Sequence, residues 1–151
     1  AQFKGYKKLA ETYSWTDAGN IAHMYAGLAY FNLGDYKKAI EQLESFSPKG
    51  DETVSANALA ALGNAYVADK QFDNGVKYLK KAADKADNEA LSPEYLIQAG
   101  LVLENQGKKA EANELYERVK KDYPQSRYSQ SVPQNGVATS PEIDKYIERT
   151  K

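Results

Sequence analysis

The side chains best suited to chemistry are few in this sequence, and they do not cluster along the chain. His23 is the only histidine, and it stands among apolar residues with helical spacing. We interpret His23 as a half-buried packing residue and not as a general base. The chain has no cysteine, which excludes a thiol nucleophile, a disulfide and a thiolate metal site. It also lacks the Gly-x-Ser-x-Gly pattern of a serine hydrolase.

Two further clusters of polar residues have ordinary explanations. Gly100 and the run 107–109 are spaced too widely for a phosphate-binding loop, and no serine or threonine follows the lysines. Asp84, Asp87 and Glu89 lack the alternating ligands and the central glycine of a calcium loop. We therefore predict no catalytic residue, no metal site and no cofactor, and we do not expect an enzyme.

The composition narrows the class of partner. Lysine and arginine number 20 against 21 aspartates and glutamates, so the chain lacks the basic excess of a nucleic-acid surface. No apolar run approaches the length of about 18 residues that a membrane span needs. The chain begins at Ala-Gln-Phe without methionine, inside a helical pattern. We therefore expect a targeting or anchoring segment to precede it.

Helices must position all of these residues, as the spacing of the apolar side chains indicates. Near the N-terminus, large apolar residues recur at steps of three and four, at Phe3, Tyr6, Leu9 and Tyr13. The same order of residues recurs at Tyr116, Val119 and Tyr123. Residues 1–13 therefore resemble the second helix of a repeat whose first helix is missing. Residues 14–20 have the composition of a loop.

The fold class follows from internal repetition. Four sets of positions recur at intervals of 36 and 37 residues: Gly27, Gly63 and Gly100; Tyr30, Tyr66 and Leu103; Ala39, Gly75 and Ala112; and Leu43, Leu79 and Tyr116. The small residues let paired helices approach, and the large residues fill the space around each contact. One such unit cannot bury its apolar face alone, so the units must stack into a superhelical solenoid.

We predict a single domain over residues 1–151. Its parts are a leading helix at 1–13, repeats at 20–47, 54–86 and 92–122, a flexible loop at 125–140 and a capping helix at 141–150. Gly34 and Asp35 form the first turn, and Ser92 is expected to cap a helix that has Pro93 in its first turn. Gly75 lies in mid-helix where the sister repeats have alanine. Gly75→Ala is therefore expected to stabilise the fold by about 0.5 to 1 kcal/mol.

These units resemble the tetratricopeptide repeat. The resemblance is carried by residues 27–40, Gly-Leu-Ala-Tyr-Phe-Asn-Leu-Gly-Asp-Tyr-Lys-Lys-Ala-Ile, and by residues 62–66, Leu-Gly-Asn-Ala-Tyr. The third unit matches through Gly100, Gly107, Ala112, Tyr116 and Pro124. The resemblance covers about residues 21–124 and implies an all-α, right-handed alpha-alpha superhelix of three helix pairs that binds proteins. Phe46, Lys70 and Gly75 depart from the residues that the family prefers.

A second resemblance concerns the motif Tyr123-Pro124-Gln125-Ser126 and the stretch 142–147. Both are similar to bacterial cell-envelope tetratricopeptide proteins, several of which are anchored by an N-terminal membrane helix and work outside the inner membrane. This resemblance implies a periplasmic protein that is tethered to the inner membrane by a segment outside this sequence. A cytoplasmic location is the alternative.

The tetratricopeptide resemblance also implies a binding groove. In the family, four side chains on the first helix of each unit line a concave face. The matching positions here are Ile21, Met24, Leu28, Phe31, Asn57, Ala60, Asn64, Val67, Glu94, Ile97, Leu101 and Glu104. The implied groove is apolar at one end and polar at the other. The family's clamp for a terminal carboxylate needs Lys or Arg at several of these positions, and only Asn64 fits, so we predict no receptor of that kind.

Two functional hypotheses remain. Met24, Leu28 and Phe31 suit the docking of an amphipathic helix, unless another part of the chain covers them as core. The leading hypothesis is a non-catalytic scaffold that presents its groove to a peptide or helix of a partner protein, in bacterial envelope protein assembly or translocation. The rival is a structural element that forms homo-oligomers through its open N-terminal edge. The sequence names neither the partner nor the pathway.

Overall fold

The chain folds into a row of packed helices. A computed structural model describes residues 2–12, 16–131, 133 and 139–151. Within these residues there are eight helices and no strand. The helices are α1 (Gln2–Thr12), α2 (Asp17–Asn32), α3 (Tyr36–Glu44), α4 (Glu52–Ala68), α5 (Phe72–Ala86), α6 (Ser92–Asn105), α7 (Lys109–Asp122) and α8 (Glu142–Thr150). Each helix packs against its neighbours in the chain, which confirms the predicted alpha-alpha solenoid.

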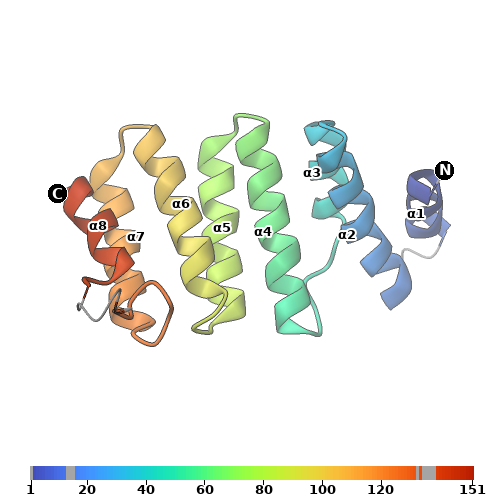
Figure 1. The fold of residues 1–151 in the computed structure, drawn as a ribbon. Coiled ribbons are helices and arrows are strands. Elements are labelled where there is room, and N and C mark those ends of the chain that lie inside the picture. The colour runs from blue at the N-terminus through green and yellow to red at the C-terminus, as the bar shows by residue number, and fades with distance from the viewer. Residues whose placement is uncertain (1, 13–15, 132, 134–138) are drawn as a thin grey trace.

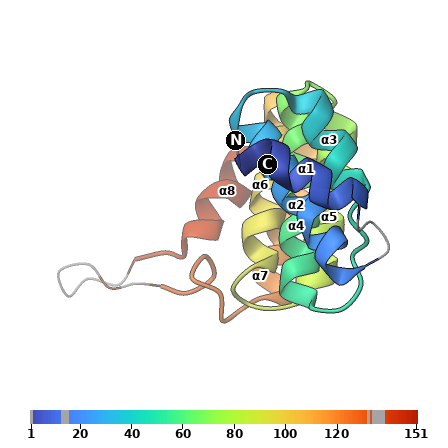
Figure 2. The same ribbon diagram turned by 90° about the vertical axis from the view of Figure 1, so that its right-hand side faces the viewer.

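The two ends of the row are far apart. Figure 1 shows α1 at one end and α8 at the other, with the remaining helices between them in chain order. The end view in Figure 2 separates the layers, with α6 and α8 on the left and α3 and α5 on the right. Residues of α2, α4 and α6, the first helices of the three pairs, line a common groove, so these helices form one face of the solenoid.

Small residues let the paired helices approach, as the repeat pattern predicted. A side chain at Gly27 would place its Cβ 2.4 Å from Cγ of Leu43. At Gly100 the same atom would lie 2.4 Å from a ring carbon of Tyr116. Both of these large partners are buried, so there is no room for even a methyl group between the helices.

The pair α4 and α5 is closer than the sequence suggested. A Cβ at Gly75 would lie 2.4 Å from Cγ2 of Val67 and 3.1 Å from the carbonyl oxygen of Gly63. This pair therefore packs through two glycines, whereas the other pairs have an alanine at the position of Gly75. The structure argues against the prediction that Gly75→Ala stabilises the fold, because the added methyl group requires Val67 to shift.

Two helices begin earlier than the composition indicated. α2 begins directly after Thr16, whose hydroxyl oxygen accepts a hydrogen bond from the Gly19 N–H at 3.0 Å. α4 begins directly after Asp51, whose carboxylate accepts one from the Val54 N–H at 2.8 Å. Such caps satisfy the free N–H groups of a first helical turn. The prediction of a loop through Asn20 is therefore wrong.

The predicted cap at Ser92 is also wrong. α6 begins at Ser92 itself, after Leu91, and Pro93 lies in its first turn as predicted. The buried Ser92 hydroxyl donates a hydrogen bond to the Ala83 carbonyl at 2.8 Å and accepts one from the Asn88 N–H at 3.0 Å. Ser92 therefore joins the end of α5 to the start of α6.

α8 covers the C-terminal end of the solenoid. Its Ile143 and Ile147 are buried in the same core cluster as residues of α6 and α7. The stretch expected to be a loop contains turns over residues 124–130, and residues 132 and 134–138 lie outside the described residues. Tyr13 of the N-terminal apolar stripe also lies outside them, as do the side chains of Phe3 and Leu9.

Candidate partner-binding groove

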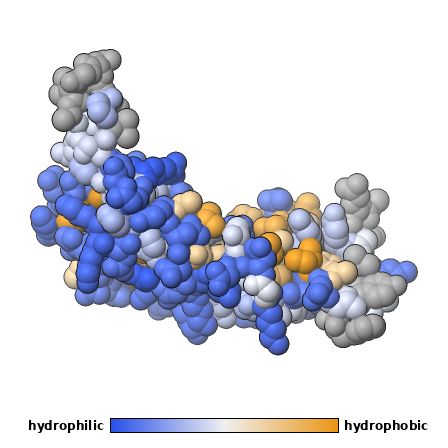
Figure 3. All heavy atoms as spheres, turned by 90° about the horizontal axis from the view of Figure 1, so that it is seen from below, coloured by the Kyte–Doolittle hydropathy of each residue, from blue (hydrophilic) through white to orange (hydrophobic). Residues whose placement is uncertain are grey.

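A groove of about 750 Å³ runs along the face formed by α2, α4 and α6. Its lining consists of Met24, Leu28, Phe31, Asn57, Ala60, Ala61, Asn64, Val67, Ala68, Tyr95 and Gln98. Figure 3 shows the hollowed upper edge of the molecule, where hydrophobic atoms gather in the middle and on the right and hydrophilic atoms dominate on the left. The apolar part of this edge belongs to the N-terminal half of the row.

α2 supplies the large apolar side chains of the groove. Met24, Leu28 and Phe31 are spaced by four and three residues, which places them on one face of the helix. All three are half-buried, so each keeps part of its apolar surface exposed to the groove. The Phe31 ring packs against Tyr36 of α3, with 5.5 Å between ring centroids, and this contact fixes its position.

α4 forms a floor of small side chains. Ala60, Ala61 and Ala68 end at Cβ, so the surface of α4 recedes between the bulkier residues on either side. Val67 and Asn64 lie on the same floor. The hollow therefore follows from small side chains at the positions of α4 that face the groove.

Polar groups stand at fixed points of this apolar surface. The Tyr95 hydroxyl donates a hydrogen bond to Oδ1 of Asn57 at 2.6 Å, which links α6 to α4. Burial, aided by the charge of Glu94, raises the pKa of Tyr95, so the hydroxyl stays protonated at neutral pH. Oε1 of Gln98 is buried and has no hydrogen-bond partner among the described residues.

The groove carries no charge of its own. None of its eleven lining residues is ionisable near neutral pH, and α2, α4 and α6 contain no lysine or arginine. A bound carboxylate would therefore find no cation in the groove. The arrangement suits an apolar segment that brings a few hydrogen-bonding groups.

The structure brings together seven of the twelve positions that the family pattern predicted. They are Met24, Leu28, Phe31, Asn57, Ala60, Asn64 and Val67, all from α2 and α4. Ile21 lies elsewhere, in a cavity at the N-terminal edge that Tyr6 and Tyr25 also line. The binding role of these positions stays a prediction.

The two glutamates of the third repeat do not line the groove. Glu94 pairs with Arg127 from the turns after α7, with 2.7 Å between Oε2 and Nη2. Glu104 pairs with Arg149 of α8, with 2.7 Å between Oε1 and Nη2. The polar end implied by the sequence therefore lies in a separate region, next to α8.

The other two positions of the third repeat also lie outside the groove. Ile97 belongs to the core, and Leu101 is 38% exposed but does not line the groove. The adjacent residues Tyr95 and Gln98 face it instead. Each follows a predicted position by one residue, so the family spacing points to the correct helix but to the wrong side of it.

The remaining chemical candidates have structural roles. Nδ1 of the half-buried His23 lies 3.1 Å from Oε1 of Gln42, which joins α2 to α3. Among the described residues, no group of three or more His, Cys, Asp or Glu side chains is placed to hold a metal ion. Within the same residues, no helix combines the length and the apolar content that crossing a membrane requires.

Comparisons with known proteins agree with this architecture. A family model described as a tetratricopeptide repeat-like domain matches residues 2–135. A crystal structure of MamA has a TM-score of 0.66 and 22% sequence identity, covering 98% of this chain and 84% of that chain. A comparison with curated proteins finds no match. At this identity, the likeness to MamA supports the fold alone.

Proposed function

The chain belongs to the tetratricopeptide repeat-like domain family, and from this premise we propose that it is a non-catalytic scaffold for a partner protein. The segment that it holds lies in the groove between α2, α4 and α6. Domains of this family are generally interaction modules without catalysis. The observation that carries the proposal is the row of half-exposed apolar side chains on α2, facing a floor of small residues on α4.

The dimensions of the groove limit its occupant. The groove crosses three helices, so its occupant must contact α2, α4 and α6 at once. Its apolar face would bury Met24, Leu28 and Phe31, and the rigid walls would keep the entropic cost of binding low.

A charge placed in the groove tests the proposal. The probe is a phage-displayed library of random 16-residue peptides, selected on the immobilised chain, from which the strongest binder is synthesised. We expect Leu28→Asp to weaken its binding at least tenfold, because burial of a leucine is worth about 1.5 to 3 kcal/mol. Fluorescence anisotropy measures the affinity, and circular dichroism checks that the helices remain.

Leu101→Asp is the matched control. It makes the same substitution at an exposed leucine of α6 that does not line the groove. We expect its affinity for the peptide to stay within about twofold of the unmodified chain. Equal affinities of Leu28→Asp and Leu101→Asp would overturn the proposed function.

A second candidate function is self-association at the N-terminal edge. Tyr6 of α1 and Tyr25 of α2 are 41% and 47% exposed and stack with 5.7 Å between their ring centroids. An apolar cavity of about 370 Å³ adjoins them. Two exposed aromatic rings suit an interface with a second copy. Light scattering over a range of concentrations tests this candidate, and a monomer at all concentrations would exclude it.

The location of the scaffold is a further part of the proposal. The likeness of residues 123–126 and 142–147 to bacterial envelope proteins supports a role in envelope protein assembly or translocation, with the domain outside the inner membrane. Any membrane link lies in a segment outside this sequence. Protease added to spheroplasts is expected to digest the full-length protein. Protection from the protease would indicate the cytoplasmic alternative.

A further inference from the structure

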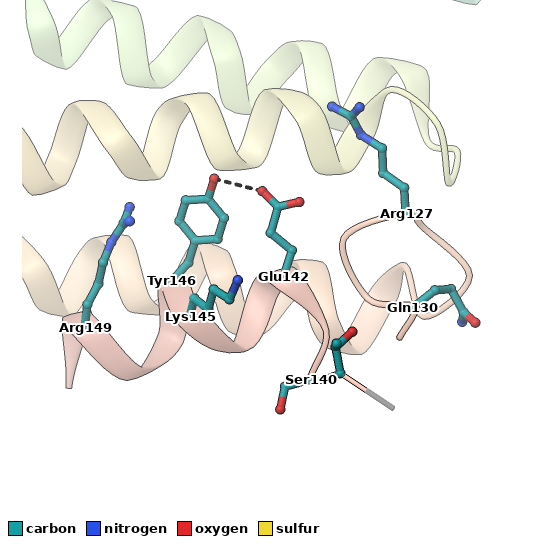
Figure 4. Close-up of a pocket in the computed structure, with 8 residues that line it drawn as sticks. Arg127, Gln130, Ser140, Glu142, Lys145, Tyr146 and Arg149 are labelled. Atoms are coloured by element: carbon teal, nitrogen blue, oxygen red, sulfur yellow. Dashed lines mark hydrogen bonds between the residues drawn. The ribbon is translucent and has the colours of Figure 1, made fainter. Parts of the chain in front are cut away.

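A second cavity, of about 810 Å³, lies at the C-terminal end of the molecule. We call it the α8 cavity. It is lined by Arg127, Gln130, Thr139, Ser140, Glu142, Lys145, Tyr146 and Arg149. Figure 4 shows Arg149 and Arg127 at opposite ends, with Tyr146 and Glu142 of α8 between them. The cavity thus has a cation at each end.

The ion pairs at these ends point their cations outward. The side chain of Glu104 is 18% exposed, whereas that of its partner Arg149 is 45% exposed. Glu94 is 38% exposed, whereas Arg127 is 72% exposed. The carboxylates therefore lie beneath the guanidinium groups. A guanidinium group has five N–H donors, and these pairs use only some of them, so donors remain for a bound anion.

The middle of the cavity adds a third cation. Lys145 is exposed and forms no ion pair with any residue that the structure describes. Glu142 is the carboxylate of the lining, and it accepts a hydrogen bond from Tyr146 at 3.3 Å. Three cations and one carboxylate thus line the α8 cavity, and the paired Glu94 and Glu104 balance the two arginines, so the region has no net charge. Because both arginines are more exposed than the glutamates that they bind, the outer surface of the cavity presents cationic groups to a ligand.

The positions of the two arginines set the distance between the anionic groups that the α8 cavity can bind. Their partners Glu94 and Glu104 are ten residues apart on α6, a rise of about 15 Å. An extended chain covers this distance in about five residues. Two carboxylates at that separation along a polypeptide would reach both ends of the α8 cavity.

The groove and the α8 cavity both border α6. Tyr95 and Gln98 of this helix line the groove, and Glu94 and Glu104 anchor the arginines of the cavity. We propose that the α8 cavity binds an acidic stretch of the same partner segment whose apolar part lies in the groove. This inference rests on the proposed function. The partner class is thus a protein segment with an apolar stretch followed or preceded by aspartates and glutamates.

The peptide library also tests this inference. We expect the selected peptides to share an apolar cluster with acidic residues on one side of it. The strongest binder is then synthesised in two forms, one with its acidic residues and one with each replaced by the matching amide. Lys145→Glu is expected to weaken binding of the acidic form by about three- to tenfold and to leave the amide form unchanged.

Lys80→Glu is the matched control for Lys145→Glu. Lys80 is an exposed lysine on α5, away from the α8 cavity, so the variant makes the same change in net charge. If both variants weaken binding of the acidic peptide equally, net charge explains the effect and the inference is wrong. Circular dichroism of both variants confirms that the fold is retained.

The possible results separate this inference from the proposed function. Selected peptides that have an apolar cluster without acidic residues, and that bind Leu28→Asp more weakly than the unmodified chain, would overturn the inference and support the proposed function of the groove. If Lys145→Glu weakens peptide binding but Leu28→Asp does not, the proposed function of the groove is wrong. The inference that one segment occupies both sites is then wrong as well. A library from which no peptide is enriched would overturn both.

Discussion

The two ends of the concave face are built on the same repeat and differ in the charge of the side chains that line them. At the α2 and α4 end, the surface is apolar, uncharged and hollowed by alanines. At the α6 and α8 end, two arginines and a lysine line a polar cavity, and the glutamates of α6 anchor the arginines. The packing beneath both ends is alike, since Gly27 contacts Leu43 as Gly100 contacts Tyr116.

This difference shows which positions the repeat determines. Residues between paired helices must be small or must fit a buried gap, so they recur in phase. Side chains on the concave face have no such constraint and are free to differ from one repeat to the next. The fold is therefore common to both ends, whereas the choice of partner depends on the surface of each end.

The largest expected loss of stability distinguishes core residues from groove residues. Tyr116 is fully buried and packs against Gly100 of α6 and Tyr146 of α8. Tyr116→Ala is expected to lower the free energy of unfolding by about 3 to 5 kcal/mol. Phe31→Ala removes a half-exposed ring and is expected to cost about 1 kcal/mol. Urea denaturation measures both, and similar losses would show that the groove residues are core.

The next prediction concerns the ion pair between Glu104 of α6 and Arg149 of α8 and its contribution to stability at different pH values. Burial raises the pKa of Glu104, but hydrogen bonds from Arg149 and Tyr116 and the charge of Arg149 outweigh it, so the folded pKa lies below the ordinary value. A carboxyl group with a lowered folded pKa stabilises the fold above its unfolded pKa of about 4.3. That stabilisation is lost as the pH falls through the folded pKa.

Glu104→Gln is therefore expected to lower the free energy of unfolding by about 1 to 2 kcal/mol at neutral pH. The difference from the unmodified chain should shrink as the pH falls below about 4. Glu148→Gln is the control, at an exposed position of α8. Thermal melts from pH 7 to pH 3 measure both variants, and a difference that does not change with pH would contradict the ion-pair account.

A smaller effect tests whether the packing beneath the groove is as tight as beneath α8. Gly75→Ala is expected to destabilise the fold by about 1 kcal/mol, because the contact with Val67 and Gly63 outweighs the gain in helix propensity. In a Val67→Ala background the same change should cost less. Denaturation of the four variants measures this coupling, and a higher melting temperature of Gly75→Ala alone would contradict it.

The smallest effect concerns the turn between α4 and α5. Lys70 has a φ of 63°, whereas glycines occupy the equivalent positions 34 and 107 with φ of 77° and 76°. Left-handed backbone conformations favour glycine, so Lys70→Gly is expected to stabilise the fold by about 0.5 to 1 kcal/mol. Gly107→Lys should lower the free energy of unfolding by a similar amount. Denaturation experiments measure both variants. A loss of stability in Lys70→Gly, or a gain in Gly107→Lys, would contradict this account of the turn.

The solenoid was predictable because both sides of each helix contact repeat in phase. Gly27, Gly63 and Gly100 identify one partner, and the large residues that fill the contact identify the other. The closeness of α4 and α5 was not predictable in this way. It depends on how Val67 sits against Gly75, and a repeat interval carries no information on that distance.

The groove was predictable only where neighbouring repeats alone shape it. On α2 and α4 the residues predicted from the family spacing line the groove, as Leu28 and Asn64 illustrate, with the exception of Ile21. On α6 it did not, because residues far along the chain occupy that side of the helix. Arg127 and Arg149 bind Glu94 and Glu104 across 33 and 45 residues of sequence. Such contacts leave no local pattern that sequence analysis can detect.

Methyl NMR of the chain with a selected peptide tests the central claim most directly. The claim predicts that the signals of Met24, Leu28 and Val67 shift as peptide is added, whereas those of the buried Leu79 and Val119 do not. If the methyl groups of the groove stay unchanged while signals elsewhere on the surface move, the partner binds another face and the claim is wrong.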